Sequence, residues 1–154
     1  MRPLGIAVLG AALLSTLLLS GGHADAARSK TPYARIPSVG DTVRLDGTVG
    51  GSKAAWAYYE QAWLESYLRA TIDAAEANKP YSDMTDQINR VAAHVVSVAN
   101  GTKASVEVVQ PFTYKEKMDM EVRVLLQEGP HRGREVWTTC GEVVDSSGHP
   151  FVRM

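Results

Sequence analysis

Alternating hydrophobic and polar positions predict short strands in the second half of the chain. Between Met118 and Leu126, hydrophobic residues stand at every second position: Met118, Met120, Val122, Val124 and Leu126. This alternation is typical of a strand with one face on a core and the other in water. The β-rich stretch REVWTTC at 134–140 predicts a second strand, and a turn at Asp145–Gly148 precedes a short closing strand.

A hairpin is predicted around Asn100–Gly101, because this residue pair favours a type I′ turn and β-branched residues flank it. A two-residue turn there would place two pairs of residues opposite each other: Val95 with Val106, and Ala93 with Val108. A further short strand is predicted at Val43–Leu45, before the turn residues Asp46–Gly47.

Hydrophobic residues recur at helical spacing between Lys53 and Asn78. They form one broad face: Trp56, Tyr59, Trp63, Tyr67, Ala70 and Ala74. The spacing predicts an amphipathic helix, with Ser52 as its cap and Pro80 as the residue that prevents its continuation. A second, shorter helix is predicted to start at Ser82–Asp83. We expect the aromatic row to pack in a core, and a ligand platform is the alternative.

The predicted helices come before most of the predicted strands. This order favours an α+β fold with an antiparallel sheet over a parallel sheet of βαβ units. The chain is therefore divided into four segments: a signal peptide at 1–26, a flexible leader with a possible short strand at 27–51, a segment of two helices at 52–91, and a β-rich domain at 92–154.

The first 26 residues have the order of a secretory signal peptide. Arg2 precedes an apolar run from Leu4 to about Leu19, and the small residues at Ala24 and Ala26 suit a cleavage site. The run is shorter than the ~20 residues that span a bilayer. We therefore expect export to the periplasm or the extracellular space with no membrane span after cleavage. An uncleaved anchor is the alternative.

Charge argues against a nucleic-acid partner. After cleavage, 15 Lys and Arg (16 minus Arg2) stand against 16 Asp and Glu (17 minus Asp25), which gives a net charge of −1. A chain with this balance has no basic field for nucleic acid or for anionic lipid.

The single cysteine, Cys140, excludes an intrachain disulfide. We expect a buried structural thiol, with an intermolecular disulfide or a nucleophile paired to a histidine as alternatives. His94, His131 and His149 do not stand in the close pairs that bring two ligands to one metal ion. No metal site and no cofactor are therefore expected.

Two stretches, VANGTKASVEVV and EVRVLLQEGPHRGREVWTT, resemble the bacterial SH3-like (Src-homology-3-like) small-barrel modules of exported proteins. The shared features are a Gly-Thr turn, an alternating valine strand, a glycine-bounded turn and a following strand with a Trp; they cover residues 93–145 approximately. The resemblance implies a small antiparallel SH3-like β-barrel. With the helices predicted from the spacing, the expected fold class is α+β, an N-terminal helical segment followed by this barrel.

The stretch EGPHRGREVWTT, at 128–139, is interpreted as a tight turn between strands. A phosphate-binding loop needs glycine amides at a helix N-terminus, whereas here a strand follows and Pro130 removes one amide donor. His131, Arg132 and Arg134 then form a cationic tip, which is either only solvated or in contact with an acidic ligand.

The sequence therefore predicts an exported, non-enzymatic binding module. We expect a peptide or a cell-wall component to contact one surface formed by five residues: Trp137, Tyr114, His131, Arg132 and Arg134. One alternative is a structural protein in which the aromatic helix face, with Trp56, Trp63 and Tyr67, binds another protein or a second copy. A Cys-dependent hydrolase is the second alternative.

Overall fold

The computed structural model of the protein describes residues 36–78 and 85–151. The described residues all belong to one compact unit, Tyr33–Met154. The predicted signal peptide, the first part of the predicted leader (27–35) and the predicted start of the second helix lie outside the described residues. Within the described ranges, no helix has both the length and the apolar character needed to cross a membrane.

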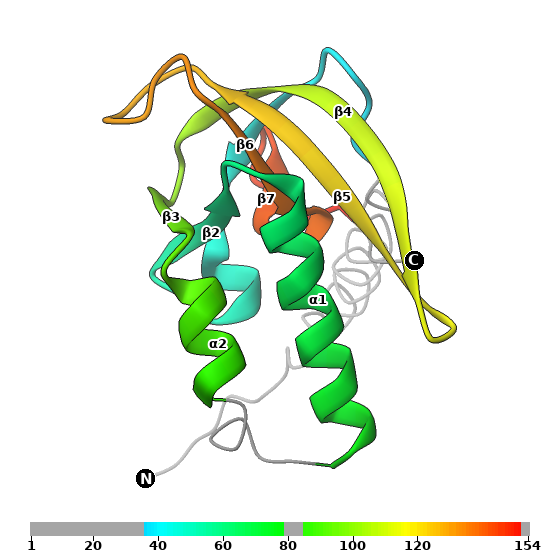
Figure 1. The fold of residues 1–154 in the computed structure, drawn as a ribbon. Coiled ribbons are helices and arrows are strands. Elements are labelled where there is room, and N and C mark those ends of the chain that lie inside the picture. Colours follow the sequence, from blue (N-terminus) through cyan, green and yellow to red (C-terminus); the bar gives the residue numbers. More distant parts are fainter. Residues whose placement is uncertain (1–35, 79–84, 152–154) are drawn as a thin grey trace, which may run out of the picture. The chain divides into compact units, whose positions relative to one another are not determined.

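The unit Tyr33–Met154 is built on one curled antiparallel sheet, a half-barrel (Figure 1). Its seven strands lie in the order β3-β2-β6-β5-β4-β1-β7. Their bounds are β1 Thr42–Leu45, β2 Ala54–Tyr58, β3 Val95–Ala99, β4 Lys103–Tyr114, β5 Lys117–Leu126, β6 Glu135–Thr139 and β7 Val143–Asp145. The described residues also include two α-helices, α1 at Gln61–Glu76 and α2 at Thr85–Ala92, and two 3-10 turns, η1 at Gly47–Gly50 and η3 at Cys140–Glu142.

The predicted fold class, α+β with an N-terminal helical segment followed by a small SH3-like β-barrel, is wrong. The described chain is mostly β, and β1 and β2 precede α1 in sequence yet belong to the same sheet as the later strands. The helices are thus an excursion between β2 and β3. The prediction failed because the neighbours of a strand in a sheet are set by contacts between distant residues, which local patterns do not report.

The helix predicted from Lys53 begins only at Gln61. Residues Ala54–Tyr58 form β2, in which Ala55 and Ala57 are fully buried on one face of the sheet. Trp56 and Tyr58 lie on the other face, so the same residues satisfy the two-residue period of a strand. The residue before α1 is Glu60, not Ser52, and it makes no side-chain capping bond.

The turn at Asn100–Gly101 is present, but the hairpin predicted around it is wrong. Strand β3 pairs with β2, where Val95 lies opposite Tyr58, while β4 pairs with β1 and β5. The turn is bonded to the first residue of η1 instead. The Asn100 Oδ1 accepts a hydrogen bond from the Gly47 amide at 2.9 Å. Gly101 has φ of 86°, a conformation that glycine adopts without steric cost.

The concave face of the sheet encloses the main hydrophobic core. Valine and alanine side chains from all seven strands meet there, together with Phe151 and the fully buried Cys140. Strand β5 supplies the residues predicted for its core face, from Met120 to Leu126, although Met118 at its start is 51% exposed. No residue of α1 belongs to this core.

Helix α1 packs on the opposite face of the sheet. Leu64 and Leu68 form a second apolar cluster with Tyr58, Phe112 and Val91. The long β4–β5 hairpin extends along the helix (Figure 1). At its tip, the Lys115 Nζ lies 2.6 Å from Asp73 Oδ1 and 3.3 Å from Glu76 Oε2. These exposed ion pairs connect the hairpin to the last turns of the helix.

Candidate functional site

A cleft of about 900 Å³ lies between α1 and the sheet; we call it the α1 cleft. Helix α1 lines it with residues from Leu64 to Glu76, β2 with Trp56 and Tyr58, and β5 with Lys117–Asp119. Ser52, Thr139 and Glu142 complete the lining. Its volume falls within the roughly 300–1,000 Å³ of small-molecule sites.

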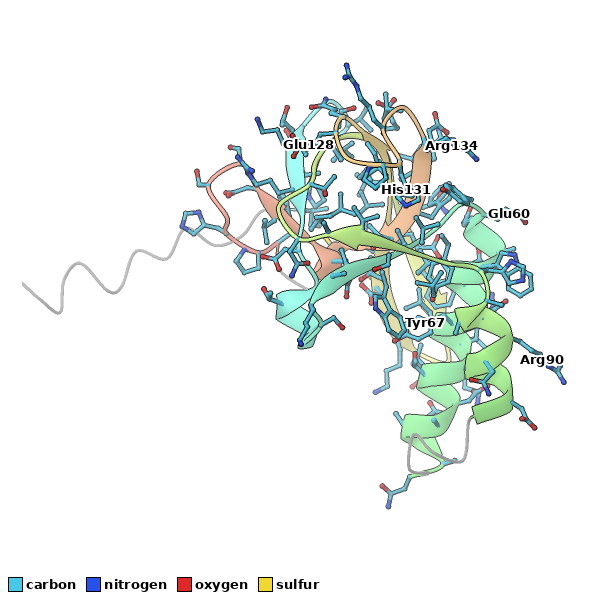
Figure 2. All side chains as sticks on the ribbon, turned by 90° about the vertical axis from the view of Figure 1, so that its left-hand side faces the viewer. Glu60, Tyr67, Arg90, Glu128, His131 and Arg134 are labelled. Atoms are coloured by element: carbon cyan, nitrogen blue, oxygen red, sulfur yellow. The ribbon has the colours of Figure 1, made fainter. Side chains whose placement is uncertain are left out.

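Aromatic rings form one wall of the α1 cleft. The ring centroids of Trp56 and Tyr67 are 6.1 Å apart, and those of Tyr58 and Tyr67 are 6.3 Å apart. Tyr67 projects from α1 towards the sheet (Figure 2). The main chain of Trp56 is fixed on both sides, because its amide donates to Glu142 Oε2 at 3.1 Å and its carbonyl accepts from Thr138 Oγ1 at 2.8 Å. The main chain that carries the Trp56 ring is therefore anchored to its neighbours.

Carboxylates outnumber cations along the α1 cleft. Glu76, Asp119 and Glu142 stand against Lys117 in its lining, a formal charge of −2. Lys115 lies at the adjacent hairpin tip, where its hydrogen bonds raise its own pKa and lower the pKa of Asp73. The cleft therefore combines an apolar, aromatic wall with a negative rim.

A buried carboxyl group, Glu121, lies on β5 beneath the start of α1. It is 1% exposed, and its Oε2 accepts hydrogen bonds from Gln61 Nε2 at 2.9 Å and from Gln110 Nε2 at 3.1 Å. Its Oε1 has no hydrogen-bond partner among the described residues. Burial raises the pKa of Glu121, because the charged form loses its hydration. In the sheet it lies opposite Thr139, which lines the α1 cleft.

The surface predicted from the sequence is divided by the fold. Tyr114 lies at the end of β4 next to the hairpin tip, whereas His131, Arg132 and Arg134 follow the other end of β5. Since β5 has ten residues, its ends are roughly 30 Å apart at the usual rise per residue. Trp137 is half-buried on β6, and its ring lies 5.7 Å from the Arg123 guanidinium. The three loop residues remain together, but Tyr114 is far from them.

The stretch between β5 and β6 is a tight turn, as predicted. The Gly133 amide donates to the Leu126 carbonyl at 2.8 Å, and the Leu126 amide donates to the Arg134 carbonyl at 3.0 Å. His131 and Arg134, both labelled in Figure 2, contact Tyr59. The Tyr59 hydroxyl lies 3.0 Å from His131 Nδ1, and the Arg134 guanidinium lies 4.8 Å from the tyrosine ring.

A second aromatic pair lies next to this turn. Trp63 and His94 stack with ring centroids 3.6 Å apart and planes 11° from parallel. They line a groove of about 210 Å³ with Tyr59, Glu60 and Val95 among others. No local pattern identified Tyr59 as a partner of the turn, because it is separated from His131 by 72 residues.

The alternative aromatic helix face is not one continuous surface. Trp56 lies on β2, Trp63 stacks on His94, and Tyr67 lines the α1 cleft; all three are half-buried. Cys140 is fully buried in the concave core, as expected of a structural thiol. The described residues contain no group of three or more His, Cys, Asp or Glu side chains arranged to hold a metal ion.

The chain was compared with protein-family models, with curated proteins and with solved structures, and none of the three comparisons found a match. The resemblance of residues 93–145 to SH3-like modules is therefore a prediction without support from a relative.

Proposed function

We propose that the protein is an exported, non-enzymatic binding protein whose α1 cleft holds an organic cation with an apolar body. The observation that carries the proposal is the pairing of an aromatic wall with an excess of carboxylates in one cleft of about 900 Å³. A ligand of this class places its apolar part against the rings and its charge at the rim.

The apolar part of the ligand would pack against side chains of α1 and β5. Leu68, Ile72 and Met118 line the cleft, and Met118 is 51% exposed. Covering such surface contributes roughly 25 cal/mol per Å² of apolar area removed from water. Trp56 and Tyr67 add an attraction for cations, because the faces of their rings are negative.

The charge of the ligand is selected by the carboxylates. Asp119 and Glu142 lie in the lining, and Lys117 is the cation beside them. An anionic ligand of the same shape would be repelled by the carboxylates, which outnumber the cation Lys117 in the lining. The proposal therefore includes discrimination by charge, and not only by size.

Export is proposed from the sequence of the first 26 residues, with Arg2, the apolar run and the small residues at Ala24 and Ala26. Mass spectrometry of the protein recovered from the periplasm or the medium tests it. We expect the recovered chain to begin at Ala27. Recovery only from the membrane, with the first residues still attached, would contradict cleavage.

The ligand proposal is tested by calorimetric titration with phenylbutylammonium and phenylbutyrate, which share an aromatic body and differ in charge. We expect the cation to bind at least about tenfold more tightly, a difference of about 1.4 kcal/mol. Asp119→Asn should remove most of this preference. Glu107→Gln, which removes a β4 carboxylate outside the cleft lining, is the matched control. Equal affinity for the two compounds, or equal effects of the two variants, would refute the proposal.

A further inference from the structure

The second site lies where the ends of three neighbouring strands of the sheet come together. Strands β3, β2 and β6 are adjacent, and β2 is antiparallel to both. The start of β3, the end of β2 and the start of β6 therefore lie at the same edge. The residues next to these ends are His94, Tyr59 and Arg134.

We call this surface the aromatic–cationic patch; it consists of Tyr59, Trp63, His94, His131, Arg132 and Arg134. Two contacts fix its aromatic residues, the stacking of Trp63 on His94 and the packing of Arg134 over Tyr59. The patch shares no residue with the lining of the α1 cleft. It is thus a separate surface.

The guanidinium groups of the patch have no carboxylate partner among residues 36–78 and 85–151. Neither Arg132 nor Arg134 belongs to the ion pairs of this part of the chain, whereas Arg123 on β5 lies 3.3 Å from Glu135. Glu60, before α1, is the one acidic residue in the lining of the adjacent groove. The two arginines are exposed and remain available to an external carboxylate.

We propose that the aromatic–cationic patch binds an acidic segment of a partner protein in an extended conformation. A carboxylate of the segment meets Arg132 and Arg134, and an aromatic side chain enters the groove beside Trp63 and His94. This role goes beyond ligand binding in the α1 cleft, because it assigns the protein a macromolecular partner at a different surface.

The size of the patch fits a short peptide segment. The groove, at about 210 Å³, is smaller than the roughly 300 Å³ at which small-molecule sites begin, so it suits one side chain rather than a whole ligand. Two strand spacings separate β3 from β6, roughly 10 Å. An extended chain covers this distance in about three residues. The partner's acidic and aromatic residues should therefore stand two or three positions apart.

The test uses fluorescence anisotropy with labelled peptides that contain Glu-Ala-Phe, Gln-Ala-Phe or Glu-Ala-Ala within the same flanking glycines. We expect the first peptide to bind at least about tenfold more tightly than either of the others. Added salt should weaken its binding, because exposed charges are screened over a Debye length of about 10 Å at 0.1 M ionic strength.

Protein variants assign the binding to the patch. Arg134→Gln and Arg132→Gln should each lower the affinity for the Glu-Ala-Phe peptide by about tenfold. Arg90→Gln is the matched control, because this exposed arginine on α2 lies outside the patch and loses the same charge (Figure 2). Circular dichroism melting of each variant separates loss of binding from loss of folding.

Three results would overturn the proposal. The first is equal affinity for the glutamate and glutamine peptides, and the second is the absence of saturable binding by the Glu-Ala-Phe peptide. The third is preferential binding, through the same arginines, of an oligosaccharide of uronic acids, which would assign the patch to an acidic cell-wall component instead. Each result is independent of the phenylbutylammonium titration, which probes the α1 cleft.

Discussion

The Nε2 of Gln61 donates to the Oε2 of Glu121 at 2.9 Å, and this bond joins the first turn of α1 to the middle of β5. Gln110 donates to the same oxygen from β4, so the helix and two strands share one buried carboxyl group. The other oxygen, Oε1, has no hydrogen-bond partner among the described residues. Burial raises the pKa of Glu121 and outweighs the two hydrogen bonds, which by themselves favour the charged carboxylate.

The pKa of Glu121 makes stability depend on pH. Burial raises this pKa above the ordinary value of 4.5 in the folded protein, so the folded state binds the proton more tightly than the unfolded state does. The resulting stability is present at low pH and is lost as pH rises through the folded pKa. We expect the unfolding free energy of the wild type, relative to that of Glu121→Gln, to increase as pH falls from neutral to about 5. Urea titrations at both pH values measure the gain, and a constant difference would contradict it.

Gly47 should not tolerate a side chain. A Cβ at this position would lie 2.6 Å from the Ala54 carbonyl carbon and closer still to its oxygen, and a backbone group cannot rotate away. We expect Gly47→Ala to cost about 3 kcal/mol of unfolding free energy. Gly51→Ala is the control: its φ is 82° with no atom near the added Cβ, so about 1 kcal/mol of backbone strain is expected. Equal losses in the two variants would show that the close approach of η1 to β2 is unimportant.

Met118 offers a way to change the charge of the α1 cleft without disturbing the core. Its side chain is 51% exposed while it lines the cleft. We expect Met118→Arg to lower the affinity for phenylbutylammonium by about tenfold, and Met118→Gln to lower it much less. Calorimetry measures both affinities. If the two variants behave alike, the change in charge is not what matters.

Cys140 should react with thiol reagents only after unfolding. It is fully buried in the concave core. We expect its labelling rate in native buffer to be lower than in concentrated urea by several orders of magnitude, because the folded state must open first. Rapid labelling of the native protein would contradict this burial and would renew the case for an intermolecular disulfide.

Local patterns predicted the features that depend on local chemistry. The strand predicted from the alternation of Met120–Leu126 is present, because one of its faces packs in the core. The turn predicted at 129–133 is also present, and its Gly129 and Gly133 adopt positive φ. Residues Gln61–Glu76 were helical as predicted. In each case, the residues that carry the signal also make the structure.

The failures share a different cause. The aromatic positions from Trp56 onwards fit a helical period, but the small residues Ala55 and Ala57 allow the same segment to enter the sheet as β2. The pairing of β3 with β2 depends on Asn100 reaching Gly47, more than fifty residues earlier in the chain. Likewise, Tyr59 and His131 meet across 72 residues. Single-sequence patterns carry no information on such distant contacts.

The main core contains no residue of α1, so the sheet can keep its interior while the helix moves. Displacing α1 would expose the smaller cluster around Leu64 and Leu68 and would break the Gln61–Glu121 hydrogen bond. We expect α1 amides to exchange hydrogen at lower opening free energies than the doubly paired amides of β5. If α1 opens independently of the main core, the width of the α1 cleft can change without disturbing the sheet. In the proposed binding role, we then expect the cleft to accept several related compounds rather than a single one.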